Sequence, residues 1–174
     1  MRDVVAEAQA GRAEAFEVLV DHFAPQVYRL ASAIVGPDDA RDVAQETFIA
    51  AWRELPRLRD PDRFEPWLRR ILVNRSRNVL RGRQRRPAAS LDLLGATDGL
   101  SGEPDFREAA HARQALDGAF AGLSADQRAV IALHYGADLS IRDAAKSMGV
   151  AVGTAKSRLN AALRRLRVAV EGQR

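Results

Sequence analysis

The 174-residue chain contains no cysteine. It can therefore form neither a disulfide nor a zinc site with thiolate ligands, which fits a protein of the reducing cytoplasm. Long apolar runs are missing as well. The opening MRDVVAEAQAGRAEAF lacks the apolar core of a secretion signal, and no later stretch approaches the length of a membrane span. We expect a cytoplasmic protein without membrane insertion.

Groups suited to catalysis are also scarce. The histidines His22, His111 and His134 are scattered, no phosphate-binding glycine loop or nucleophile elbow occurs, and the carboxylates form no metal-like cluster. We expect no catalytic residues, no metal site and no cofactor, and we interpret the histidines as packing or surface residues. These absences disfavour an enzyme that acts on nucleic acid.

Basic charge is abundant but clustered. Residues 69–86 contain eight arginines and no acid, and residues 152–170 contain five cations and no acid. Between them, residues 88–108 contain five acids and a single arginine. Two basic blocks separated by an acidic stretch indicate a polyanionic partner such as nucleic acid.

Apolar residues recur at helical spacing along most of the chain. The pattern predicts helices over residues 13–34 (with a kink or break at Pro25), 38–55, 66–83, 106–120, 124–135, 140–148 and 152–170. The intervening segment 87–105 loses this periodicity and is rich in Gly, Pro, Ser and Asp, as is typical of linkers. We therefore predict an all-α fold with two small helical domains, residues 1–86 and 106–174, joined by a flexible linker at 87–105.

The last two predicted helices, with a turn at Gly149 between them, form a helix-turn-helix pattern. A projection of about 100° per residue separates two sides of the final helix. One side is apolar, with Val152, Ala155, Leu159, Ala162, Leu163, Leu166 and Val170; the other has Gly153, Thr154, Ser157, Asn160, Ala161 and Arg164, flanked by Lys156, Arg158, Arg165 and Arg167. Small polar residues between cations suit a major groove about 12 Å wide, with cations towards phosphates. The alternative is a basic amphipathic helix that only packs on one side.

Three segments carry a family resemblance. SIRDAAKSMGVAVGTAKSRLNAALRRLR resembles region 4 of bacterial RNA polymerase sigma factors of the extracytoplasmic-function class, especially at GTAKSRL, where the family usually has GTVKSRL. DDARDVAQETFIAAWREL and FEPWLRRILVNRSRNVLR are similar to the family's DAEDLVQETFLRAWR and F-x-x-WL-x-x-IA-x-N segments. Because the matches occur in order and cover most of the chain outside the linker, the resemblance is more specific than either basic helix alone.

The resemblance implies a promoter-specificity subunit of RNA polymerase, built from sigma region 2 and sigma region 4, and not an enzyme. Its implied partners are the polymerase core, through the clamp of the β′ subunit and the β flap, promoter DNA, and an anti-sigma factor in many relatives. Polymerase binding is implied for Asp42, Gln45, Glu46 and Phe48, which match the family motif.

Two sets of DNA-binding residues follow from the same resemblance. Region 2 would capture the proximal promoter element during strand opening, with a cationic track and base-sized pockets or stacking. Its candidate residues are Arg63, Phe64, Trp67, Arg70, Asn74, Arg77 and Arg81. Region 4 would recognise the distal element as duplex through Gly153, Thr154, Lys156, Ser157, Arg158, Asn160 and Arg164.

The sequence departs from the family pattern within the final helix. Ala161 and Leu163 stand where arginines are usual, and DAA at 143–145 replaces the common EIA. An unusual or weaker distal element is therefore expected. Two other classes of protein stay open: a stand-alone helix-turn-helix regulator, for which the first half offers no recognisable dimerisation or ligand domain, and a basic helical module that binds RNA nonspecifically.

Overall fold

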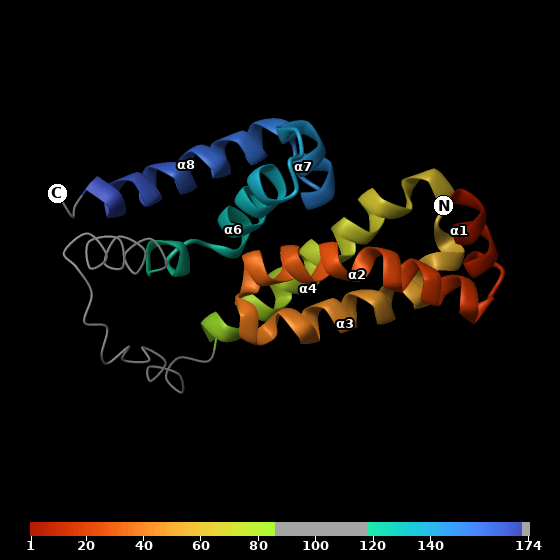
Figure 1. Ribbon diagram of the computed structural model, residues 1–174. Coiled ribbons are helices and arrows are strands. Elements are labelled where there is room, and N and C mark those ends of the chain that lie inside the picture. The colour runs from red at the N-terminus through yellow and green to blue at the C-terminus, as the bar shows by residue number, and fades with distance from the viewer. Residues whose placement is uncertain (86–117, 172–174) are drawn as a thin grey trace, which may run out of the picture.

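The computed structural model describes residues 1–85 and 118–171, and its helices form two domains (Figure 1). The first domain contains α1 (Arg2–Gln9), α2 (Ala13–Val35), α3 (Pro37–Glu54), the 3₁₀ turns η1 (Leu55–Arg57) and η2 (Pro61–Arg63), and α4 (Phe64–Arg85). The second contains α6 (Ala125–Ile131), the π turn η3 (Ala132–Gly136), α7 (Ile141–Met148) and α8 (Val152–Glu171). The described ranges contain no strand, which confirms the all-α fold. The predicted linker and most of the predicted helix 106–120 lie outside these ranges.

Helix α2 is continuous through Pro25, so the predicted break does not occur. Phe23 and Val27, before and after the proline, are both buried on one face of the helix, and this packing offsets the backbone hydrogen bond that the proline cannot donate. The helix ends at Gly36, whose φ of 97° turns the chain into α3. Pro37 then occupies the first position of α3, where a proline is tolerated.

Helix α1 was not predicted from the sequence. Only Val5 and Ala8 of this short helix are buried, so it has no periodic apolar stripe long enough to recognise. It is attached by Gln9, whose side-chain amide donates to the backbone oxygens of Leu55 at 3.2 Å and Leu58 at 2.6 Å. These bonds tie α1 to the turn between α3 and α4.

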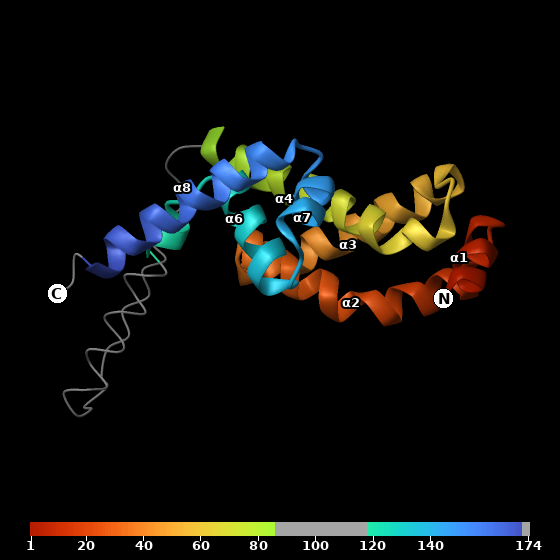
Figure 2. The same ribbon diagram turned by 90° about the horizontal axis from the view of Figure 1, so that it is seen from above.

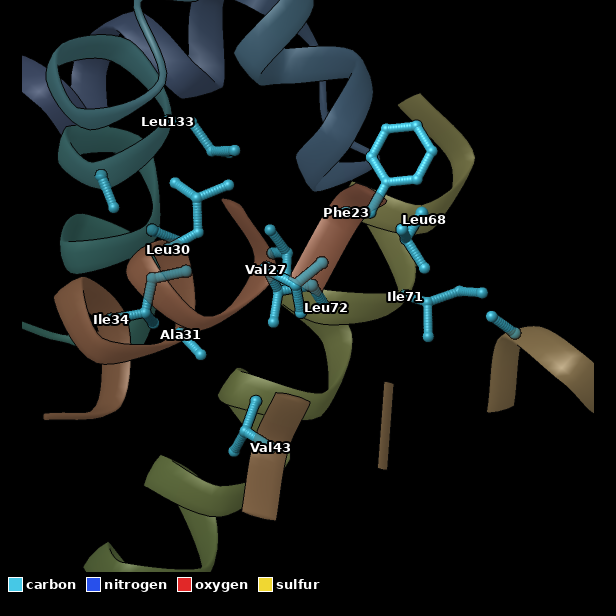
Figure 3. Packing of buried hydrophobic residues seen from close by; sticks show 14 of the residues in the cluster. Phe23, Val27, Leu30, Ala31, Ile34, Val43, Leu68, Ile71, Leu72 and Leu133 are labelled. Carbon is cyan, nitrogen blue, oxygen red and sulfur yellow. The ribbon is translucent and has the colours of Figure 1, made fainter. Parts of the chain in front are cut away.

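The two domains share a single hydrophobic core. Leu133 of η3 is fully buried and lies beside Leu30 of α2 (Figure 3), in the same cluster as Ile34 and Leu72. Helix α7 packs against α4, and α6 packs against both α2 and α4 (Figure 1 and Figure 2). The sequence predicts the two domains but not their contact.

The starts of α6 and α7 and the turn after α7 follow the local sequence. Ser124 and Gln127 form a complete capping box on α6, with bonds of 3.3 and 2.9 Å. At α7 the Ser140 hydroxyl accepts from the Asp143 amide at 3.1 Å and donates to the Asp143 carboxylate at 2.6 Å. Gly149 ends α7 in the left-handed conformation, with φ 65° and ψ 37°, which confirms the predicted turn.

Helix α6 ends at Ile131 and continues as the π turn η3, where the sequence predicts one helix to Tyr135.

Within the described residues, no helix combines the length and the apolar character that crossing a bilayer requires.

Candidate nucleic-acid interface

The predicted polar side of α8 is exposed. Of the residues assigned to the distal element, Gly153, Thr154, Lys156, Ser157, Asn160 and Arg164 are open to solvent. On the opposite side Ala155, Leu159 and Ala162 are buried against α6 and α7. This arrangement leaves small and polar side chains projecting from the second helix of the helix-turn-helix. It is the geometry in which a recognition helix enters a major groove.

Two cations at the edges of α8 are engaged within the protein. Arg165 donates to the backbone oxygen of Gly122 at 3.2 Å, which holds α8 against the segment before α6. Arg158, assigned to the distal element, has its Nη2 2.9 Å from Oδ2 of Asp126. Among the residues assigned to the distal element, Arg158 is thus the one that is partly buried and forms an ion pair.

Four residues assigned to the proximal element share one side of α4. Arg70, Asn74, Arg77 and Arg81 recur at spacings of three and four, and all but Arg77 are exposed. Nε of Arg77 lies 2.6 Å from Oδ1 of Asp126, and its Nη1 donates to the backbone oxygen of Met148 at 2.9 Å. This side of α4 therefore runs along the contact with the second domain.

Burial changes the electrostatics of Arg77. Desolvation lowers the pKa of its guanidinium, and the neighbouring Asp126 carboxylate raises it in part. Arg158 and Arg81 add like charge and lower this pKa further. Arg77 stays protonated at neutral pH, because a guanidinium does not lose its proton in proteins. It consequently depends on Asp126 for charge compensation.

The aromatic candidates near the start of α4 lie in the core or at its edge. Phe64 is buried, with its ring centroid 5.3 Å from that of Phe23 and 5.7 Å from that of Trp67. Trp67 is partly buried against the same cluster. Arg63 is exposed beside Asp60, with an N–O separation of 3.8 Å. In this conformation Arg63 is accessible to a DNA strand, whereas Phe64 is not.

The residues assigned to polymerase binding lie along α3. Asp42, Gln45 and Glu46 are exposed on one side of the helix, and Phe48 is partly buried against the core. Two residues that the sequence motif did not indicate, Ile49 and Trp52, are 43% and 38% exposed and extend the same surface by one turn. Its position in the sequence could have indicated Ile49. It lies three residues after Glu46 and four after Gln45, so it shares their side of the helix and faces away from the buried Val43.

Asp126 was also missed, and no local signal could have found it. One arginine partner comes from α8 of the same domain and the other from α4 of the first domain, so the three-residue cluster exists only once the domains pack together. The histidines behave as predicted where they are described. His22 is exposed, and Nδ1 of His134 is 2.7 Å from the backbone oxygen of Leu139; His111 lies outside the described residues. In the ranges 1–85 and 118–171, no group of three or more His, Cys, Asp or Glu side chains is arranged to hold a metal ion.

Two family models and several known proteins match this chain. Residues 19–86 match the family model for Sigma-70 region 2, and residues 113–166 match that for Sigma-70, region 4. The chain is 33% identical over 165 residues to the ECF RNA polymerase sigma-E factor of Escherichia coli K12, covering 90% of this chain and 86% of that protein. It is 34% identical over 174 residues to the ECF RNA polymerase sigma factor SigL of Mycobacterium tuberculosis, covering 96% and 95%.

Two solved structures resemble the chain over most of its length. CnrH, solved in complex with the cytosolic domain of CnrY, is 28% identical with a TM-score of 0.66, over 98% of this chain and 97% of that one. The sigma factor RpoE of Bartonella quintana, solved with the anti-sigma factor NepR, is 27% identical with a TM-score of 0.65, over 93% and 100%. The exposed α8 surface, the two matched sigma regions and these relatives together show that the chain belongs to the extracytoplasmic-function sigma factors of bacterial RNA polymerase.

Proposed function

We propose that this sigma factor binds core RNA polymerase and directs initiation at a restricted set of promoters, with α8 recognising the distal element as duplex and α4 capturing the proximal element during strand opening. The observation that carries the proposal is the exposed polar side of α8, directly after the Gly149 turn. Gly153 lets the helix start approach the DNA backbone, and the hydroxyl of Thr154 and the amide of Asn160 can bond base edges. Lys156 and Arg164 at either end of this surface suit phosphate contacts.

Region 2 supplies the second promoter contact and the polymerase contact. Exposed Asn74, between Arg70 and Arg81, places an amide within a cationic track, which suits a single strand whose bases have left the stack. On α3, acidic and amide groups surround the exposed apolar Ile49 and Trp52. An apolar centre with a polar rim is typical of a protein interface. We assign this surface to the clamp of the β′ subunit and region 4 to the β flap.

Reconstituted transcription tests the proposal. Purified full-length protein and core polymerase are incubated with genomic DNA, and transcript 5′ ends are mapped. We expect starts that are absent with core alone, preceded by two shared upstream elements. A matched control is Asn160→Ala, which keeps the helix and its charge but removes the central amide; it should lose initiation without losing core binding.

Two outcomes would contradict the proposal. Absence of any new start with active core polymerase would overturn it directly. Nanomolar, sequence-specific duplex binding by the protein alone, with no effect on polymerase, would instead indicate a stand-alone regulator. Because the proposed action requires polymerase and chromosome, we also assign the protein to the cytoplasm.

A negative regulator is a further proposed partner. The similar RpoE structure from Bartonella quintana contains the anti-sigma factor NepR. By analogy, an anti-sigma factor would bind this chain and block the surfaces that contact polymerase. Co-purification from the source bacterium, before and after mutation of Ile49 to Ala, would identify such a partner and show whether it competes with polymerase for α3.

A further inference from the structure

One carboxylate joins the two proposed promoter-binding surfaces. Asp126 in the first turn of α6 contacts Arg77 of α4 through Oδ1 at 2.6 Å and Arg158 of α8 through Oδ2 at 2.9 Å. Arg77 belongs to the set assigned to the proximal element, and Arg158 to the set assigned to the distal element. A single acid therefore binds one arginine from each.

The cluster is well shielded from water. The side chains of Arg77, Asp126 and Arg158 are 11%, 25% and 29% exposed. Arg77 is held further by its bond to the backbone oxygen of Met148, at the end of α7. Partly buried ion pairs are screened by salt less than surface pairs are. This cluster consequently differs from the exposed pair between Arg2 and Asp62, whose side chains are 66% and 57% exposed.

The charges of the cluster are not balanced. Two guanidinium groups share one carboxylate, so the cluster carries a net positive charge, and the two arginines repel each other. Without Asp126, the same approach of α4 to α8 would bring two desolvated cations together with no counter-charge. The close packing of the domains at this point therefore depends on Asp126, and a second anion would be favoured there.

We propose that Asp126 acts as an internal substitute for DNA phosphate, which clasps the two domains together in the free protein and keeps Arg77 and Arg158 from promoter DNA. The inference rests on the proposed function, because it takes both arginines to be DNA ligands. Carboxylate and phosphate oxygens both carry the negative charge that pairs with a guanidinium. The clasp and the promoter consequently compete for the same two side chains.

The competition has a thermodynamic consequence. DNA that requires Arg77 binds only the open population, so its apparent affinity falls in proportion to the fraction of open molecules. Conversely, a partner that separates the domains frees Arg77 from Asp126, while Arg158 keeps its ion pair within the second domain. The clasp thereby links polymerase binding, which needs both domains, to DNA binding.

DNA binding by the free protein tests the competition. The variant is Asp126→Asn, measured by fluorescence anisotropy on a 30-base-pair fragment with an unpaired central bubble, which offers both duplex and single-stranded DNA. The matched control is Asp138→Asn, since Asp138 is exposed in the same domain, makes no ion pair within the described residues, and has a φ of 51° that asparagine tolerates. Both variants remove one negative charge. We expect the affinity for DNA to rise by about fivefold or more in Asp126→Asn. In the Asp138→Asn control it should rise by less than about twofold.

Distance measurements test the clasp itself. Because the chain has no cysteine, spin labels can be placed at Glu17→Cys and Val168→Cys, exposed positions in the two domains. We expect a narrow distribution for the parent and a broader, longer one for Asp126→Asn. Arg77→Gln, measured without DNA, should broaden the distribution in the same direction, because it removes the partner of Asp126 on α4. It leaves the first turn of α6 intact, so it guards against local unfolding in the Asp126 variant.

The outcomes are decisive in each direction. Unchanged distances in both variants would overturn the clasp, and opening without tighter DNA binding than the Asp138 control would overturn the competition. Neither measurement contains polymerase. Failure of the reconstituted transcription would therefore be distinguishable from failure of the clasp.

Discussion

Arg128 of the second domain donates from Nη1 to the backbone oxygen of Ile34, in the last turn of α2, at 3.4 Å. Arg83 of α4 donates to the next oxygen, that of Val35, at 3.5 Å. Arg83 also pairs with Asp39 at 2.6 Å, whereas Arg128 forms no ion pair with a carboxylate in the described residues. Its charge is met by the negative end of the α2 dipole and by the Phe120 ring, 5.8 Å away. The C-terminus of α2 is thus a second electrostatic contact between the domains.

Substitution of Arg128 by Ala should weaken this contact. Burial lowers the pKa of Arg128, and Arg83 adds repulsion, so part of the gain from the helix dipole is already offset. We expect the free energy of unfolding to fall by about 1 kcal/mol, within the range for a partly buried cation at a helix C-terminus. Urea unfolding measures it, with the exposed Arg142→Ala as the control. Equal losses for the two variants would contradict the contact.

Asp143 should show the effect of its cap in a pH titration. The hydrogen bond from Ser140, and secondarily that from Lys146, lowers the pKa of Asp143 below its ordinary 3.8. Its contribution to stability is therefore present above that ordinary value and is lost as the pH falls through the lowered pKa. Ser140→Ala should raise the pKa towards 3.8, and Lys146→Gln should raise it less. Carbon NMR of the carboxyl group measures both; a larger rise with Lys146→Gln would reverse the assigned order.

The helices and the exposed polar side of α8 were predictable because both depend on periodicity. Spacings of three and four residues located α2, α3, α4, α7 and α8 to within about two residues at each end. The same projection correctly placed Ala155 and Leu159 in the core and Ser157 and Asn160 in solvent. Family membership followed from three segments that match the family in order, and the comparisons confirm it.

The contact between the domains could not be predicted, because it depends on side chains that meet only in three dimensions. Arg77 and Asp126 each look like solvated surface charges in their own helices. Phe64 illustrates the opposite case: the family resemblance implied a DNA contact for it, whereas its ring packs on Phe23 in this conformation. Its role in DNA binding stays a prediction.

Ile49 should be important for polymerase binding. It is an exposed apolar residue among Gln45, Glu46 and Trp52, and central apolar residues contribute most to interface affinity. We expect Ile49→Ala to weaken binding to core polymerase by about fivefold or more. Val18→Ala, a truncation of another exposed aliphatic residue, on α2, should leave it unchanged. Titration of labelled core polymerase measures both, and equal affinities would remove Ile49 from the interface.

Arg164 should contact a phosphate of the distal element. It is exposed on α8, one turn beyond Asn160. In holoenzyme on a mapped promoter fragment, Arg164→Ala should weaken binding and reduce the slope of log K against log salt by about 0.9. Arg29→Ala, which removes an exposed arginine from α2, should leave the slope unchanged. An unaltered slope with Arg164→Ala would show that it makes no phosphate contact.

Ala161 is where an arginine should change promoter preference. The residue is half-exposed on α8, four residues after Ser157 and three before Arg164, so a longer side chain there would project along the recognition surface. Bidentate bonding of arginine to guanine contributes about 1 to 3 kcal/mol of discrimination. We therefore expect Ala161→Arg holoenzyme to select guanine at one distal position from a randomised promoter library. Ala6→Arg adds the same charge on α1 and should select nothing new. If Ala161→Arg instead tightened binding to every sequence alike, its guanidinium would lie on a phosphate, and the base specificity of α8 would rest on Thr154, Ser157 and Asn160.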